Sequence, residues 1–205
     1  MIALIDYGAG NVRSVQKALE AAGGEVRIAL RPEDLLGTSH IVLPGVGAFG
    51  DCMAALKRTG LADALHTAVR QGTLLLGICV GLQVLFEAGE EMGEHAGLGM
   101  FPGRVVRFPA DIPARGFKVP HTGWNLVEQV RDTPLLAGLP ERFWAYFNHA
   151  YVARAQPDDI VALTDHGGHF PSVVARPPIW GVQFHPEKSQ SAGLAVLRNF
   201  VRMRP

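Results

Sequence analysis

A cysteine set closely between two glycines, in Gly77-Ile78-Cys79-Val80-Gly81, is the segment best suited to chemistry. The apolar run 73–76 before it predicts a buried strand, and the apolar spacing through Phe86 predicts a mostly buried helix. A strand, a tight turn and a helix in this order hold a nucleophile in a strained turn that tolerates only small neighbours. The N–H groups and the dipole at a helix N-terminus also favour thiolate over thiol.

A cysteine nucleophile needs a general base and a group that orients the base. The segment Trp180–Glu187 alternates apolar and polar residues, which predicts a strand that ends in a loop. Because residues two apart in an extended chain point the same way, we expect Glu187 to reach one ring nitrogen of His185 while the other faces Cys79. The alternatives are a buried packing role for the cysteine and a surface His-Pro-Glu turn.

A glycine-rich loop, Leu43-Pro44-Gly45-Val46-Gly47, follows a second apolar strand predicted at 40–43. Attack of a thiolate on a carbonyl group builds negative charge on the oxygen, which nearby backbone N–H groups stabilise. The loop offers backbone without side chains at two positions, and the N–H of Val80, just after the nucleophile, is a further donor. A plain turn is the alternative, but open α/β sheets place their sites beyond the carboxyl ends of strands.

Two other motifs do not support a cofactor or metal site. The loop Tyr7–Asn11 resembles the start of a dinucleotide-binding turn, but Arg13 stands where the third glycine belongs and no acidic residue ends the next strand. The segment His166–His169 has two histidines on a glycine loop without a convincingly spaced third ligand. We therefore expect no cofactor and no metal.

Composition favours one globular domain. The chain has 205 residues, of which 48% are hydrophobic, and its 19 basic residues balance 19 acidic ones. We expect neither a nucleic acid nor a membrane as partner, because no run of like charge occurs and no apolar stretch approaches about 18 residues. With two cysteines and no signal-like start, a cytoplasmic location is expected. Cys52, within a helical pattern, is expected to be structural.

The first half of the chain alternates strands and helices, which argues for a parallel sheet with helices on both faces. Predicted strands are 2–6, 25–30, 40–43 and 73–76, and predicted helices begin at Val12 and cover 49–58 and 60–71. After about residue 100, short β-like runs occur at 104–108, 143–153, 160–163, 172–175 and 180–184, before a closing helix at about 190–203. We predict an α/β fold: a three-layer, doubly wound, mostly parallel sheet with an antiparallel C-terminal extension on the same sheet.

The order and spacing of the three motifs resemble the class I (triad) glutamine amidotransferases. Within that family, four segments are most similar to the glutaminase subunits of imidazole glycerol phosphate synthase, an enzyme of histidine biosynthesis. These segments are Asp6–Asn11, Lys118–Asn125, Tyr146–Tyr151 and His185–Ser189. The resemblance spans essentially the whole chain and implies a single amidotransferase domain over residues 1–205.

The resemblance implies hydrolysis of glutamine to glutamate and ammonia. Cys79 would form a glutamyl thioester, His185 would act as general base and acid, and Glu187 would orient His185. The residues expected to bind glutamine or the oxyanion are Gly45, Val46, Gly47, Val80 and Gln83.

The resemblance also implies a partner, a separate (βα)₈-barrel cyclase subunit that receives the ammonia in a heterodimer. Asn11, Trp124 and Lys188 would lie near that interface, and basal activity would be low without the liganded barrel. Three alternatives stay open: a glutaminase subunit for another acceptor, a stand-alone cysteine hydrolase of γ-glutamyl substrates, and a catalytically silent binding subunit.

Overall fold

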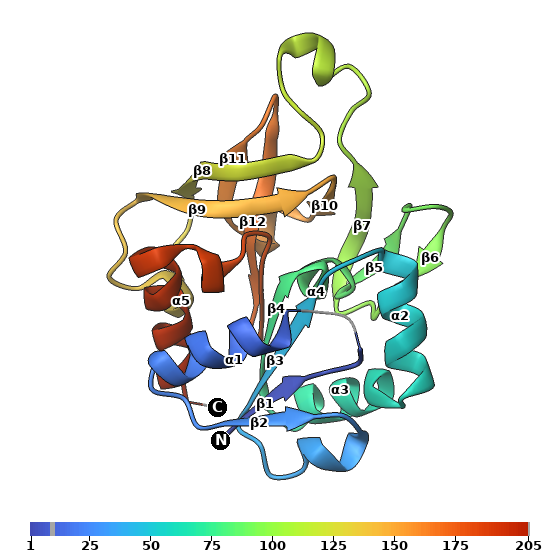
Figure 1. Cartoon of the computed structure of the whole chain (residues 1–205), viewed down its shortest axis with the longest axis vertical. Coiled ribbons are helices and arrows are strands. Elements are labelled where there is room, and N and C mark those ends of the chain that lie inside the picture. The colour runs from blue at the N-terminus through green and yellow to red at the C-terminus, as the bar shows by residue number, and fades with distance from the viewer. Residues whose placement is uncertain (9–10, 205) are drawn as a thin grey trace.

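A mixed sheet runs through the centre of the molecule (Figure 1). The computed structural model describes residues 1–8 and 11–204, and within them this sheet has nine strands. In spatial order they are β2 (Val26–Ala29), β1 (Ile2–Ile5), β3 (His40–Gly45), β4 (Leu74–Cys79), β13 (Ile179–Val182), β12 (His169–Arg176), β11 (Ile160–Asp165), β8 (His121–Gln129) and β9 (Arg142–His149). The pairings from β2 to β13 are parallel, and those from β13 to β9 are antiparallel.

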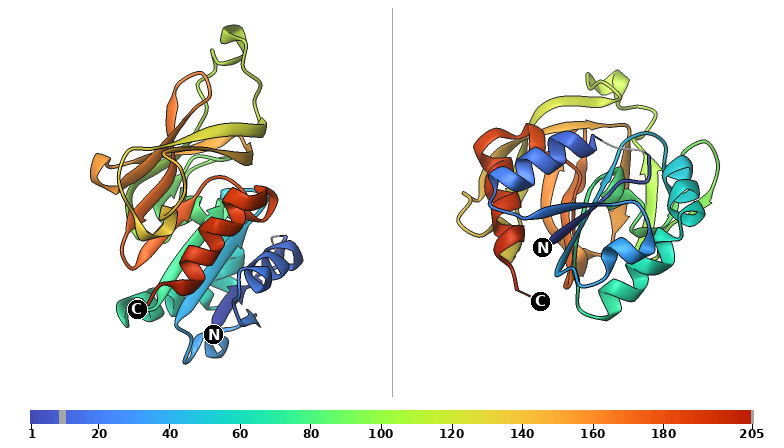
Figure 2. Two further views of the ribbon diagram at one scale, coloured as in Figure 1. Left: turned by 90° about the vertical axis from the view of Figure 1, so that its left-hand side faces the viewer. Right: turned by 60° about the horizontal axis from the view of Figure 1, so that its bottom comes forward.

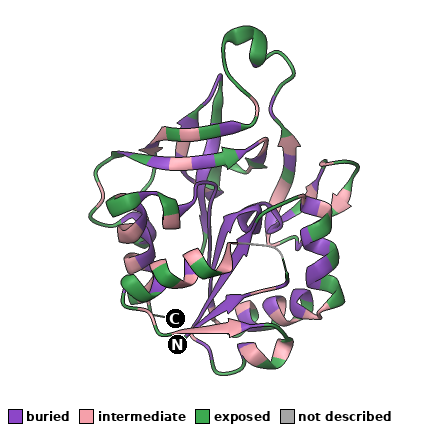
Figure 3. Cartoon of the chain, viewed as in Figure 1, coloured by how far each residue is buried: buried purple, intermediate pink, exposed green. Residues whose placement is uncertain are grey.

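Helices cover both faces of the parallel half, which gives the three layers that the sequence predicts (Figure 2). On one face lie α1 (Val12–Ala21) and α5 (Gln190–Arg202), and on the other lie α2 (Phe49–Arg58) and α3 (Leu61–Arg70). Strands β1, β3 and β4 are buried along their whole length (Figure 3). A strand that is covered on both faces needs apolar residues throughout, which explains its continuous apolar run.

A second, smaller sheet was not predicted. Its strands are β10 (Tyr151–Ala155), β7 (Phe101–Arg107), β5 (Phe86–Gly89) and β6 (His95–Ala96). The predicted run 143–153 is two strands, since the chain bends at Ala150 and β10 pairs with β7 instead of continuing β9. The prediction that all these runs extend one sheet is therefore wrong for β7 and β10.

The helix after Cys79 is much shorter than predicted. It is α4 (Val80–Gln83), and the chain already re-enters a strand at Phe86. Phe86 pairs in parallel with Phe101, and the two rings stack with centroids 5.4 Å apart. Burial of these aromatic rings and strand pairing outweigh the helical spacing of the sequence.

Proline begins each of five short 3₁₀ helices in the described residues, where its fixed φ suits the first position. They are η1 (Pro32–Leu35), η2 (Pro113–Arg115), η3 (Pro134–Leu136), η4 (Pro157–Asp159) and η5 (Pro186–Lys188).

Strand β8 was not predicted from strand patterning, because its burial does not alternate and Gly123 has φ +131°. No helix in the described ranges is long and apolar enough to span a bilayer.

Candidate active site

Cys79 occupies a strained turn where β4 ends and α4 begins. Its φ is 55° and its ψ is −113°, a backbone conformation that residues other than glycine rarely adopt. A Cβ atom at Gly81 would lie 1.9 Å from the carbonyl oxygen of Leu43, and one at Gly77 would lie 2.7 Å from the carbonyl oxygen of Gly81. The glycines therefore let the turn press against the neighbouring strand, as the motif predicts.

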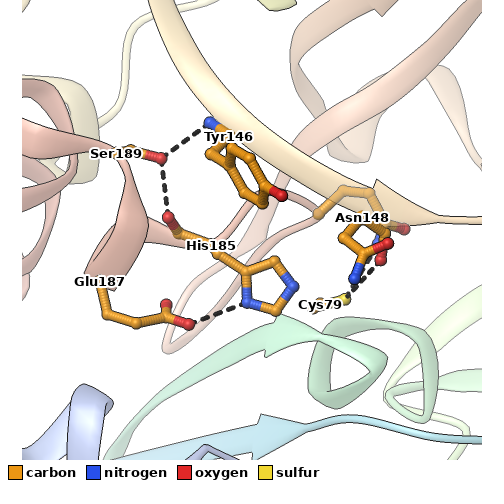
Figure 4. Close-up of polar contacts among 7 residues, drawn as sticks. Cys79, Tyr146, Asn148, His185, Glu187 and Ser189 are labelled. Carbon is orange, nitrogen blue, oxygen red and sulfur yellow. Dashed lines mark hydrogen bonds and ion pairs between the residues drawn. The ribbon is translucent and has the colours of Figure 1, made fainter. Parts of the chain in front are cut away.

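His185 lies just after β13, and its backbone is fixed from two sides. Its N–H donates to the carbonyl oxygen of Tyr146 at 2.8 Å, and its own carbonyl accepts the Ser189 hydroxyl at 2.7 Å. The ring Nδ1 is 2.9 Å from Oε1 of Glu187, and the other ring nitrogen faces Cys79 (Figure 4). The predicted contact between Glu187 and His185 is present, although a 3₁₀ turn rather than an extended chain brings them together.

The charge on His185 is set by its two neighbours. Burial lowers the pKa of His185, but the hydrogen bonds and negative charges of Cys79 and Glu187 outweigh burial and raise it to about 10. The Glu187 side chain is 1% exposed, so water screens its attraction little. The site therefore stabilises an imidazolium between the Glu187 carboxylate and the Cys79 sulfur.

Replacing Glu187 by glutamine is expected to move the alkaline limb of the pH–rate profile to lower pH. The change keeps a hydrogen-bond acceptor but removes the charge, so the pKa of His185 falls from about 10 towards its ordinary 6.5. The imidazolium is the proton donor to the leaving group, so activity is lost where it deprotonates. Titration of the His185 ring by NMR checks the shift. A ring that titrates at the wild-type pH in Glu187→Gln would contradict this assignment.

A cavity of about 230 Å³ opens over the cysteine. Its lining includes Val46, Cys79, Val80, Gln83, Tyr151 and His185. The cavity is below the usual range of drug-sized sites, and its size suits a single amino acid.

The predicted oxyanion loop reaches this cavity. Val46 and Gly47 line it, and Gly45 lies against α4, because a Cβ at that position would be 2.5 Å from the N atom of Gly81. Val46 is 41% exposed, and Gly47 has φ +98° and faces open space, where a Cβ would meet no described atom within 4 Å. Val80 follows the nucleophile at the start of α4. The structure thus places Val46, Gly47 and Val80 on the cavity and Gly45 beside Cys79 in the neighbouring strand, and their role in binding glutamine or the oxyanion stays a prediction.

Two buried residues that the sequence analysis did not assign to the site form hydrogen bonds to the backbone of this loop. The Tyr7 hydroxyl donates to the carbonyl oxygen of Pro44 at 2.9 Å, and the Cys52 thiol donates to that of Val46 at 3.7 Å. Burial raises the pKa of both groups, so both remain protonated donors at neutral pH. Tyr7 lies two residues after the end of β1, the strand that pairs with β3.

Gln83 lines the cavity, but its amide nitrogen is committed elsewhere. The nitrogen donates to the carbonyl oxygen of Tyr151 at 3.0 Å and to Oε1 of Gln183 at 3.1 Å. An amide nitrogen has two hydrogens, so only the Oε1 atom of Gln83 is left for a ligand. The predicted role of Gln83 in binding glutamine is limited accordingly.

A pair of buried histidines beside the cavity was also missed. His121 and His149 face each other across β8 and β9, with Nδ1 of the first 3.0 Å from Nε2 of the second. Burial is the main cause that lowers the pKa of each to about 3, so both rings are neutral. His149 Nδ1 must donate to the Tyr151 carbonyl at 2.9 Å, which makes its Nε2 the acceptor from His121. The pairing depends on strand register, which the residue types alone do not reveal.

The predicted interface residues lie on one side of the site. Trp124 is 44% exposed, its ring is 6.2 Å from that of Tyr146, and the Lys188 ammonium lies 5.7 Å over the same tyrosine ring. Asn11 is half-buried at the start of α1, which contacts the turn η5. Two residues of the predicted motif Asp6–Asn11, Ala9 and Gly10, lie outside the described residues.

Comparison with known proteins gives one consistent family. A family model described as glutamine amidotransferase class-I matches residues 3–203. The imidazole glycerol phosphate synthase subunit HisH of Desulfitobacterium hafniense is 49% identical over 201 residues, covering 98% of this chain and 93% of that protein. The HisH subunit of Symbiobacterium thermophilum is 49% identical over 203 residues, covering 98% of this chain and 93% of that protein. These matches confirm the resemblance predicted from the motifs.

Solved structures confirm the fold class. PurLQS from Thermotoga maritima matches 97% of this chain and 96% of its own with a TM-score of 0.76 at 18% identity. A crystal structure of a glutamine amidotransferase matches 95% of each chain with a TM-score of 0.73 at 23% identity. At these identities the likeness shows the shared α/β architecture.

Proposed function

The chain belongs to the class I glutamine amidotransferase family, and we propose that it is the glutaminase subunit of an imidazole glycerol phosphate synthase. The observation that carries the chemistry is the arrangement of Cys79, His185 and Glu187 on a cavity of amino-acid size. Residues 1–205 would act as one amidotransferase domain, of which Ala9, Gly10 and Pro205 lie outside the described residues.

In the first half of the reaction, the Cys79 thiolate attacks the side-chain carbonyl carbon of glutamine. A carbon–sulfur bond forms and the carbonyl electron pair moves to the oxygen, where the N–H groups of Val80 and of the loop 45–47 stabilise it. When the carbonyl re-forms, the carbon–nitrogen bond breaks, and the His185 imidazolium protonates the nitrogen that leaves as ammonia. The product is a glutamyl thioester on the enzyme.

In the second half, neutral His185 removes a proton from water, and the resulting hydroxide adds to the thioester carbonyl. Collapse of the intermediate breaks the carbon–sulfur bond, which releases glutamate and restores the thiolate beside an imidazolium. Glu187 holds the Nδ1–H of His185 at 2.9 Å, so the other nitrogen carries the proton in both directions. No metal or cofactor is needed in this proposal.

Ammonia would pass to a (βα)₈-barrel cyclase subunit, which would use it to form imidazole glycerol phosphate and an aminoimidazole carboxamide ribotide. The named function of the HisH relatives and their near-complete coverage of this chain support this part. The exposed Trp124 ring and the Lys188 ammonium lie against Tyr146, next to the active site, and offer a docking surface with an aromatic side chain of the kind found in interface hot spots. We place the complex in the cytoplasm, where the two free cysteines stay reduced.

Measuring glutamate release with and without the barrel subunit and its ribulosyl ligand tests the proposal. Stimulation of at least about tenfold by the liganded barrel is expected, since ligand-coupled sites commonly shift by about 5- to 150-fold. Turnover that is indifferent to the barrel would leave the thiol chemistry but move the chain to another acceptor or to a stand-alone hydrolase.

Replacing the exposed Trp124 by alanine is expected to weaken binding of the barrel about 30-fold, because a central aromatic anchor contributes about 2 kcal/mol. Basal glutamate release should stay within about twofold, since Trp124 does not line the catalytic cavity. Titration calorimetry with the barrel measures the change. Leu36, which is 73% exposed and directly follows η1, supplies the control Leu36→Ala. The segment after β2 lies at the opposite end of the molecule from β8, which carries Trp124 (Figure 1). Equal weakening by both changes would argue against this docking surface.

A further inference from the structure

Gln183 is a fully buried amide beside the reacting sulfur. It follows β13, none of its surface is exposed, and its backbone N–H donates to the Ser172 carbonyl at 2.9 Å. Burying a side-chain amide is costly unless its oxygen and nitrogen find partners. The positions of those partners therefore show what the side chain is arranged to do.

The orientation of this amide is fixed by its neighbour. Gln83 Nε2 can only donate, so the atom that it meets at 3.1 Å must be the Oε1 of Gln183. The Nε2 of Gln183 is then directed to the other side, where it lies 3.8 Å from the Cys79 sulfur. Gln83 is held in turn by its second hydrogen bond, to Tyr151 at 3.0 Å. This chain of bonds presents an N–H donor to the nucleophile.

The sulfur has a different partner for each of its protonation states. As a thiol it can donate to the carbonyl oxygen of Asn148, 3.9 Å away. Once the proton has left, the sulfur only accepts, and the donors around it are the Gln183 amide and the His185 ring. An N–H donor to an anion in a buried site stabilises that anion more than it stabilises the neutral form.

We propose that Gln183 is a catalytic residue that donates a hydrogen bond to the Cys79 thiolate, and that Gln83 is a positioning residue that orients the Gln183 amide. The proposal deepens the proposed function, because the thiolate that it stabilises is the nucleophile of glutamine hydrolysis. The His185 imidazolium, bound by Glu187, supplies a positive charge beside the sulfur, and the Gln183 amide supplies a neutral hydrogen-bond donor. Other titratable groups also surround the site. Tyr7 and Cys52 are buried and neutral, and so is His149. Glu91, Tyr151 and Lys188 line the same cavity, where Glu91 accepts the N–H of Phe49 and the Lys188 ammonium lies over the Tyr146 ring.

Alkylation of Cys79 by iodoacetamide tests the contact without glutamine. The experiment uses a Cys52→Ser background, so that only one cysteine reacts. Gln183→Met keeps the side-chain length but removes the donor, and we expect alkylation at neutral pH to slow about tenfold, with the midpoint of its pH dependence moved to higher pH. The kcat for glutamine should fall about 10- to 100-fold with KM within about threefold, because the bond acts on the nucleophile and not on the substrate.

Two further variants keep the test decisive. Gln183→Glu retains an oxygen towards Gln83 but turns an acceptor towards the sulfur, so it should raise the alkylation midpoint at least as far. Gln83→Met removes the donor that orients Gln183, together with the bond to Tyr151, but leaves the Gln183 amide in place, so it should move the midpoint in the same direction by less. Ser172→Ala is the matched control, because Ser172 is buried beside Gln183 and its hydroxyl has no partner among the described residues. Its alkylation profile should equal that of the wild type.

An unchanged midpoint in both folded Gln183 variants would overturn the proposal, whatever happens to glutamine turnover. If Gln183→Met does not fold, the Glu variant decides by the same criterion. If the Gln183 variants shift the midpoint but the wild-type chain with its barrel hydrolyses no glutamine, the contact is sustained and the proposed function is overturned.

Discussion

Replacing Cys79 by alanine is expected to lower glutamine turnover at least about 10⁴-fold, because loss of a triad nucleophile removes covalent catalysis altogether. Among the described residues, the sulfur is the group placed to attack a carbonyl in the cavity, between the His185 ring and the donors of the loop 45–47. Alanine fits the turn as cysteine does, since both carry one Cβ at φ 55°. Steady-state glutamate release, with and without the barrel, measures the loss.

Cys52→Ser is the control for this change. Cys52 is the other free cysteine and is buried in α2, and serine keeps a donor towards the carbonyl of Val46. Turnover by the control should stay within about threefold of the wild type. Residual turnover of Cys79→Ala near the wild-type level would mean that another group carries the reaction.

Gly81→Ala is expected to lower the free energy of unfolding by more than about 3 kcal/mol, a large part of the stability of an ordinary domain. The added methyl group would lie 1.9 Å from the Leu43 carbonyl oxygen and 3.1 Å from the carbonyl carbon of Pro44. Those atoms belong to a buried parallel strand that cannot move aside. Chemical denaturation, or loss of the soluble chain on expression, measures the effect.

Gly50→Ala separates this clash from a general intolerance of side chains at glycine positions. A Cβ at Gly50 also meets atoms at 2.8 Å, but they belong to the His95 ring, which is a movable side chain. Gly50 lies in α2, where alanine is the better helix former by about 1 kcal/mol. The free energy of unfolding should therefore change by about 1 kcal/mol or less, and an equal loss in both variants would contradict the argument.

The sequence predicts the site better than it predicts the second half of the fold. The elbow around Cys79 is a local feature, since glycine spacing and a preceding apolar run specify it directly. The contact between His185 and Glu187 is equally local, because the two residues lie two positions apart, and the sequence predicts it although a 3₁₀ turn rather than an extended chain forms it. The parallel half of the sheet follows from the alternation of apolar runs and helices.

The remaining parts depend on register between distant segments. The local spacing around Phe86 predicts a helix, but its ring stacks on Phe101 and the segment forms a strand. The pairing of His121 with His149 depends on the register of β8 and β9. Tyr7 reaches Pro44 because it follows β1, which is the neighbour of β3 in the sheet. None of these contacts leaves a pattern in its own segment, so composition and periodicity could not reveal them.

The glutamyl thioester on Cys79 can be trapped during turnover. The enzyme with its liganded barrel is mixed with glutamine, quenched in acid, digested, and analysed by mass spectrometry. We expect a glutamyl group on the peptide that contains Cys79, removed by neutral hydroxylamine and absent from Cys79→Ala. Glutamate formation without an adduct on Cys79, or with a glutamyl group on another residue, would contradict the thioester mechanism.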